Sequence, residues 1–405
     1  MKLGCTFTLS KMSGRVSSLI WIFCLAGASM AAAFDWPWKR VKEDASQKKS
    51  VPRIQITTFS GGTGGSASKA LRSALMSARE LFPVTESLPG GFVVTGNSTG
   101  GRVVARLKGV DGKEVFERTY AAPGLDENVK TLSDDLVYAI TGRPGLASSR
   151  ITFVSDVSGN KQIYVCDLDG GNVEQITREP YGAASPTISA DASLMAYMSY
   201  RSGFSVVQVL DLGGGREQAF SETSGGSTGP AFSPDGRFLS MTLGFVGTPE
   251  MFVTELGTGR TICLTETTGV PCSPTWHPKD PLIMYVCDEG TGPRLWLVPM
   301  NKDDKAKPWG LSRAFRTDPE WSPDGTQIAY TTRRQGSLCV AIRDYPSGRE
   351  KIIRKGGAQH PTWSPNGRFL AYVQSGSLVV HDLKTDEHQT ILADNGVISE
   401  PRWMR

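Results

Sequence analysis

Histidine is scarce in this chain of 405 residues. There are four, at positions 277, 360, 381 and 388, and none precedes residue 277. Their spacing matches no metal-ligand pattern, and a serine or cysteine nucleophile in the N-terminal part would have no histidine nearby in sequence to act as its base. The sequence therefore predicts a non-catalytic protein with no catalytic residues, no metal and no cofactor.

Cysteine is also scarce, with seven residues in all. Two of them, Cys5 and Cys24, lie in the N-terminal leader described below, and the remaining five cannot all pair. In an oxidising compartment Cys263 could pair with Cys272 or Cys287. The alternative is that these cysteines are small buried apolar side chains.

The chain also lacks a large excess of charge of either sign. The chain has 44 basic and 40 acidic residues, and three of the basic ones, Lys2, Lys11 and Arg15, lie in the leader. A nearly neutral mature chain offers no basic surface of the kind that binds phosphates. We therefore expect no nucleic-acid partner.

Long apolar runs are limited to one, Leu19–Ala28. It is shorter than the roughly 20 residues that a transmembrane helix needs. Basic residues precede it, and Ala31–Ala33 offers a cleavage site before Phe34, so residues 1–33 resemble a secretory signal peptide. A membrane anchor is the alternative. We expect an exported protein that meets a membrane only through its partners.

Residues 34–50 form a polar tail that cannot bury enough apolar surface to fold alone. It is either a flexible linker or a binding peptide, because Trp36 and Trp38 are large apolar anchors. Residues 51–146 then predict a small α/β domain, with helices at Ser66–Phe82 and Asp126–Thr141 on either side of three hairpin-linked strands.

Glycine and proline are abundant, with 45 and 24 residues, and they mark a repeat. Pro361–Val373 contains Trp-Ser-Pro-Asn-Gly, and related segments begin at prolines spaced 40 to 45 residues apart. A period of this size with several strands per unit is typical of a β-propeller. The repeated prolines are Pro186, Pro230, Pro274, Pro319, Pro361 and Pro401.

The two ends of the repeat region predict how the ring closes. The segment from Ile151 to Thr177 supplies strands two to four of a unit without its first strand, and Ser399–Trp403 supplies a first strand with nothing after it. Together they complete a shared blade, which removes two exposed sheet edges. Residues 150–405 are therefore predicted to form an all-β propeller of six four-stranded blades, which follows an α+β N-terminal domain.

The motifs do not support catalysis. Gly96-Asn-Ser98-Thr-Gly100 matches the nucleophile elbow of hydrolases, but it lies between two predicted strands rather than between a strand and a helix. The Ser-Pro-Asp-Gly segments are turns. The residue before each repeated proline varies instead, and we expect these residues to lie in loops that enter the innermost strands and to form a protein-binding rim at one mouth of the channel. They are Ser185, Gly229, Ser273, Asp318, His360 and Glu400.

The chain from about residue 51 to 405 resembles the TolB family of the Tol–Pal system. The resemblance rests on Leu132–Gly142 running into Arg150–Ser155, on Gln162–Gly171 and on the Pro-x-Trp-Ser-Pro-Asp-Gly repeats. It implies a periplasmic adaptor that binds the peptidoglycan-associated lipoprotein Pal at the propeller mouth and supports outer-membrane integrity and cell division. It also implies contact with TolA through the N-terminal tail.

The family's lipoprotein-contacting positions correspond here to Gly226, Gly229, Cys272 and Ser273. Gly226 replaces a histidine of the family pattern, and Cys272-Ser273 replaces a Thr-Glu pair. The tail, rich in Trp and Lys, differs from the family's TolA-binding peptide. Two alternatives remain: a periplasmic propeller that binds another ligand or protein, and the propeller domain of a peptidase-like enzyme, which would need a large hydrolase domain.

Overall fold

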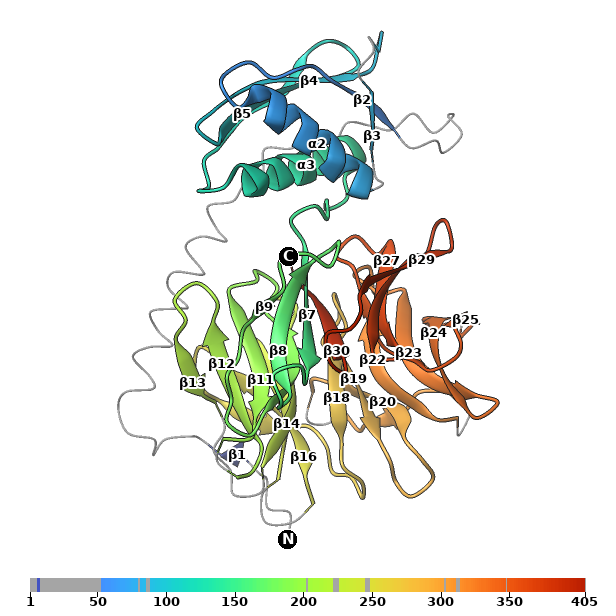
Figure 1. The fold of residues 1–405 in the computed structure, drawn as a ribbon. Helices are drawn as coiled ribbons and strands as arrows, with labels where there is room; N and C mark the ends of the chain where they lie inside the picture. Colours follow the sequence, from blue (N-terminus) through green and yellow to red (C-terminus); the bar gives the residue numbers. More distant parts are fainter. Residues whose placement is uncertain are drawn as a thin grey trace. The chain divides into compact units, whose positions relative to one another are not determined.

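The computed structural model describes residues 6–7, 52–78, 81–84, 88–201, 203–220, 226–244, 248–301, 304–310, 314–346 and 348–404. Its contacts divide the chain into two compact units between Ser149 and Arg150 (Figure 1). Within these ranges no helix has the length and apolar character to cross a membrane. The predicted leader and tail lie outside the described residues, apart from strand β1 (Thr6–Phe7), which pairs with the outermost strand of one blade.

The N-terminal unit is a mixed sheet with two helices packed on it. Strand order is β3-β2-β4-β5-β6, and β2 runs parallel to both of its neighbours. The elements are β2 (Arg53–Ile56), α2 (Gly64–Ala78), β3 (Phe82–Val84), β4 (Phe92–Thr99), β5 (Arg102–Lys108), β6 (Glu114–Tyr120) and α3 (Leu125–Thr141).

One expectation for this unit is wrong. The first helix was predicted to run through Phe82, but α2 ends at Ala78 and Phe82 begins β3. Pro83 explains the difference, because the residue before a proline is driven out of the helical region. The second helix ends as expected: Gly142 takes a left-handed φ of 71° and its N–H donates to the Tyr138 carbonyl.

The described part of the second unit is a propeller of six four-stranded blades, as the repeat predicted. Every blade is an antiparallel meander. From inner to outer strand, the blades are β30 (Ser399–Met404), β7 (Arg150–Ser155), β8 (Gln162–Asp167), β9 (Glu174–Gln175); β10 (Ala183–Ile188), β11 (Leu194–Ser199), β12 (Val206–Asp211), β13 (Glu217–Ala219); β14 (Ser227–Phe232), β15 (Phe238–Leu243), β16 (Glu250–Glu255), β17 (Thr261–Cys263); β18 (Cys272–Trp276), β19 (Leu282–Cys287), β20 (Arg294–Pro299), β21 (Lys307–Pro308); β22 (Arg316–Trp321), β23 (Gln327–Arg334), β24 (Ser337–Asp344), β25 (Glu350–Arg354); and β26 (Ala358–Trp363), β27 (Phe369–Gln374), β28 (Ser377–Asp382), β29 (Glu387–Leu392). We number them blades 1 to 6 in this order.

The ring closes through the C-terminal strand, as predicted. β30 pairs antiparallel with β7, so blade 1 joins the two ends of the propeller sequence. The inner strands also contact one another in a closed circuit, β10-β14-β18-β22-β26-β30 and back to β10. These six strands therefore surround the central axis.

The blades are held together by apolar clusters between their faces. Side chains of a strand alternate between the preceding and the following blade, so fully buried tyrosines such as Tyr285 and Tyr372 face one neighbour. The cysteines follow the same rule: Cys263, Cys272 and Cys287 contact three different inter-blade clusters, and none of the three is in a disulfide. Neither suggested disulfide forms. The three side chains pack as small apolar groups, and the Cys263 thiol also donates to the Thr265 carbonyl at 3.2 Å.

Candidate functional site

The six residues before the repeated prolines are placed differently from the prediction. They do not lie in entering loops. Each lies within an innermost strand, at a point where its pairing with the second strand shifts register. All six have a left-handed φ, from 49° to 59°: Ser185, Gly229, Ser273, Asp318, His360 and Glu400.

The physical reason is a β-bulge repeated in every blade. A bulge sets two residues of one strand against one residue of its partner, and a left-handed residue at the first position accommodates the extra length. The following proline has no N–H to donate to the ladder, so a bulge is where an inner strand tolerates it. The prediction failed because only blade 3 carries a glycine there to announce the left-handed conformation.

The six bulge residues nevertheless come together, as the repeat predicted. The backbone N–H of Ser185 donates to Glu400 Oε2 at 2.5 Å, which links blades 2 and 1. His360 Nε2 lies 3.9 Å from Asp318 Oδ2, which links blades 6 and 5. The backbone of Gly229 lies against Ser273, because a Cβ built on Gly229 would meet the Ser273 nitrogen at 3.2 Å. We call these residues the bulge ring.

The ionisable residues of the bulge ring lie on one side only. Asp318, His360 and Glu400 belong to blades 5, 6 and 1, whereas blades 2 to 4 contribute Ser, Gly and Ser. Next to the ring, Glu320 Oε2 lies 3.8 Å from Arg402 Nη1, and burial raises the pKa of the Glu320 carboxyl. The sequence analysis missed Glu320 and Arg402. Both follow a repeated proline, in a segment that was interpreted as structural because it recurs in every blade.

The strain at the bulge predicts a contrast between two substitutions of Ser273. Ser273→Gly should change the free energy of unfolding by less than about 0.5 kcal/mol, because relief of left-handed strain offsets the greater freedom of the unfolded chain. Ser273→Val should cost about 2 kcal/mol, because a β-branched side chain tolerates φ of 49° poorly. Urea unfolding of the two variants measures the difference; equal stability would show that the bulge does not constrain this residue.

The other predicted contact residues are less clearly part of the ring. Gly226 is buried immediately before β14, in the entering loop. Cys272 is the first residue of β18 and lies near Asp318, although burial is what mainly raises the pKa of its thiol. Trp36 and Trp38 fall outside the described residues.

Exposed apolar side chains mark one end of the propeller. In each meander, the connection from second to third strand and the connection into the next blade lie at the same end, which we call the entry face. Of seven large apolar side chains exposed among the described propeller residues, only Val173 lies at the opposite end. The six on the entry face are Val157, Tyr181, Tyr200, Phe204, Val270 and Val397.

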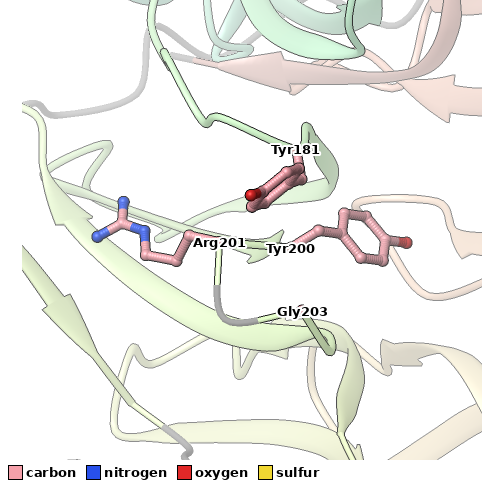
Figure 2. A pocket seen from close by; sticks show the side chains of 4 residues that line it. All are labelled: Tyr181, Tyr200, Arg201 and Gly203. Atoms are coloured by element: carbon pink, nitrogen blue, oxygen red, sulfur yellow. The ribbon is translucent and has the colours of Figure 1, made fainter.

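A pocket of about 660 Å³ lies within this face (Figure 2). It is lined by Tyr181 from the loop into blade 2 and by Tyr200, Arg201 and Gly203 from the loop between β11 and β12. The two loops are joined directly, because the Tyr200 N–H donates to the Gly182 carbonyl at 3.2 Å. Sequence reasoning missed these residues, since loop residues follow neither the repeat nor a strand period.

A buried carboxylate braces the pocket from below. Glu179, whose side chain is 2% exposed, accepts hydrogen bonds from the Tyr197 and Ser199 hydroxyls at 2.8 and 2.7 Å. It also accepts two bonds from Arg201, whose guanidinium reaches Glu217 as well. Burial alone would raise the pKa of Glu179, but these donors outweigh burial and lower it.

Two histidines that are seven residues apart meet on blade 6, which sequence reasoning did not foresee. His381 and His388 are cross-strand partners, and their Nδ1 atoms lie 3.1 Å apart. Burial is the main cause that lowers the pKa of His381, and electrostatic repulsion from His388 is the second cause. The pair does not amount to a metal centre: within the described ranges no three His, Cys, Asp or Glu side chains are grouped to hold a metal ion.

Comparisons with known proteins agree on one family. The family model of the TolB beta propeller domain matches residues 137–405. A protein TolB homolog of Chlorobium chlorochromatii is 33% identical over 135 residues, which are 31% of this chain and 30% of that protein. The Tol-Pal system protein TolB of Geobacter metallireducens is 40% identical over 91 residues, 22% of this chain and 21% of that protein. Each aligned segment spans less than a third of the relative's length.

A solved structure shows the same architecture over most of the chain. The crystal structure of TolB from Acinetobacter baumannii matches with a TM-score of 0.71, covering 89% of this chain and 98% of that chain. The sequence identity is 23%, so this likeness concerns the fold.

Proposed function

We propose, since this chain belongs to the TolB beta propeller family, that it is a non-catalytic adaptor of the Tol–Pal system of the cell envelope. It acts in the periplasm, binds the peptidoglycan-associated lipoprotein Pal at the entry face, and supports outer-membrane integrity and cell division. The resemblance of the repeats and the family match support the system; the entry face supports the binding role.

The single observation that carries the binding role is the one-sided exposure of apolar side chains. Contiguous exposed apolar surface marks interaction sites, whereas isolated apolar side chains do not. Five of the six on the entry face belong to blade 1, blade 2 or the loops that enter them, next to the side of the bulge ring that carries the ionisable residues. Apolar anchors beside polar groups are the composition of a protein-binding surface.

The geometry of the N-terminal unit gives the enzyme alternative no support. Ser98 of the Gly-x-Ser-x-Gly segment lies inside β4 and is buried, and its hydroxyl is 2.7 Å from that of Thr63. A nucleophile elbow requires an exposed serine on a strand-to-helix turn with a histidine in reach. The described unit, with five strands and two helices, instead places this serine within a hairpin strand.

The binding role is tested by replacing the ionisable bulge residues together. The variant Asp318→Asn, His360→Gln, Glu400→Gln should bind the soluble domain of Pal at least tenfold more weakly, by calorimetry, with an unchanged melting temperature. Val173→Ser, at the opposite end, is the matched control and should bind as the unchanged protein does. Equal binding by the triple variant would exclude the bulge ring from the interface.

Affinity capture from an envelope extract tests the partners themselves. The full chain should capture Pal. We propose that Trp36 and Trp38 of the tail bind TolA, so the full chain should capture TolA as well. A chain lacking residues 34–50 should then lose TolA and keep Pal. Recovery of a different ligand in place of any lipoprotein would favour the alternative of a propeller with another partner.

A further inference from the structure

Two tyrosines line the pocket of the entry face, which we call the cleft. Tyr181 is 70% exposed and Tyr200 is 37% exposed, and they come from two neighbouring loops. In Figure 2 Tyr181 stands on one loop, and Arg201 and Tyr200 extend in opposite directions from the other. Of the four residues that line the cleft, two are tyrosines, one is an arginine and one is a glycine.

Hydrogen bonds hold the two loops in position. Arg201 is held by Glu179 and Glu217, and the Tyr200 N–H is held by the Gly182 carbonyl. A tyrosine ring also has few rotatable bonds to immobilise. A side chain of a binding partner would therefore enter a cleft whose loops are already ordered. Less conformational entropy is then lost on binding.

The charges around the cleft favour a cation. Arg201, which lines it, faces two carboxylates, so its charge is more than neutralised. Glu400 of the bulge ring adds a third carboxylate. Burial is the main cause that raises the pKa of the Tyr200 hydroxyl, and the negative charge of Glu400 is the second cause. Lys161 and Arg178 of the adjoining loops are exposed to solvent, where salt and water screen them.

We infer that this cleft receives a lysine or arginine side chain of the docked protein, in contact with the rings of Tyr181 and Tyr200 and attracted by Glu400. The inference rests on the proposed binding of Pal at the entry face and names the chemistry of one contact within it. Aromatic faces carry negative potential and attract cations within about 6 Å. The carboxylate of Glu400 adds an attraction that also steers association.

The test compares variants that separate ring, hydroxyl and charge. Tyr200→Phe keeps the ring and should bind the soluble domain of Pal within twofold of the unchanged protein. Tyr200→Leu keeps apolar volume but loses the ring face, and it should bind about five- to tenfold more weakly, as should Tyr181→Leu. Glu400→Gln keeps an acceptor for the Ser185 N–H but should reduce the salt dependence of the association rate.

Melting temperatures of all four variants check that the propeller stays folded. Weaker binding by both leucine variants, with a flatter salt dependence for Glu400→Gln, supports the inference. If the leucine variants bind as tightly as Tyr200→Phe, the cation is excluded while the binding of Pal at this face stands. If the unchanged protein does not bind Pal at all, both the inference and the proposed function are overturned.

Discussion

Deletion of residues 399–405 should lower the melting temperature by about 10 °C or more and abolish a single cooperative transition of the propeller. The deletion removes β30, the inner strand of blade 1. Loss of one large buried side chain already costs about 3–5 kcal/mol, and for a domain of this size each kcal/mol lowers the melting temperature by about 2–4 °C.

Three interactions are lost together in this truncation. The ladder between β30 and β7 disappears, which leaves β7 as an unpaired edge. Trp403 no longer donates from Nε1 to the Thr362 carbonyl at 3.2 Å, the link between blades 1 and 6. The contacts of β30 with β26 and β10 also vanish, so the circuit of inner strands is interrupted.

Circular dichroism or calorimetry measures the effect, and a synthetic peptide of residues 397–405 provides the control. Adding the peptide should restore part of the lost stability, because it can pair with the exposed edge of β7 and bind only the folded form. A truncated protein that melts at the temperature of the full chain would show that the ring does not depend on this strand.

Glu179→Ala is expected to have the second-largest effect, a loss of about 2–3 kcal/mol in the free energy of unfolding. The substitution removes the carboxylate that the Ser199 hydroxyl bonds and takes one of two acceptors from the Tyr197 hydroxyl and from Arg201, which both keep Glu217. A buried polar group left without a partner loses its hydration and gains nothing in return. The loop that carries Tyr181 should loosen as well.

Glu350→Ala in blade 5 is the matched control for Glu179→Ala. Glu350 also accepts from a tyrosine hydroxyl, that of Tyr330 at 2.7 Å, and pairs with Arg334, but its side chain is 19% exposed. Water can replace the lost carboxylate there, so the cost should be about 1–2 kcal/mol. Urea unfolding measures both variants, and equal costs would contradict a special role for the buried site.

The pH dependence of Glu179→Ala has a definite sign. The pKa of Glu179 is lower in the folded protein than its ordinary value of 4.5, so its stabilisation is fully present above about pH 4.5 and is lost as the pH falls through the folded pKa. The difference in stability between the unchanged protein and Glu179→Ala should therefore shrink in acid. A difference that grows in acid would mean that the carboxylate is not the stabilising form.

The sequence by itself determined the architecture of this protein. A period of 40 to 45 residues, with an incomplete unit at each end, is enough to predict six blades and a shared closing blade. The reason is that each repeat is one local meander, and a meander is encoded by alternating apolar residues and by turns within a few residues of one another. The Ser-Pro-Asp-Gly turns could be predicted for the same reason. The Asp235 carboxylate accepts hydrogen bonds from the Ser233 hydroxyl and the Arg237 N–H, both within its own turn.

Only the tertiary structure decided the binding face. The left-handed residues of the bulge ring arise from register between strands, and serine, aspartate, histidine or glutamate at such a position carries no local mark of it. The cleft joins Tyr181 and Tyr200, which belong to loops of different length and composition. Part of its charge comes from Glu400, at least 200 positions away in the chain but one blade away in the ring. Local pattern specifies each blade, whereas a site between blades depends on how the ring closes.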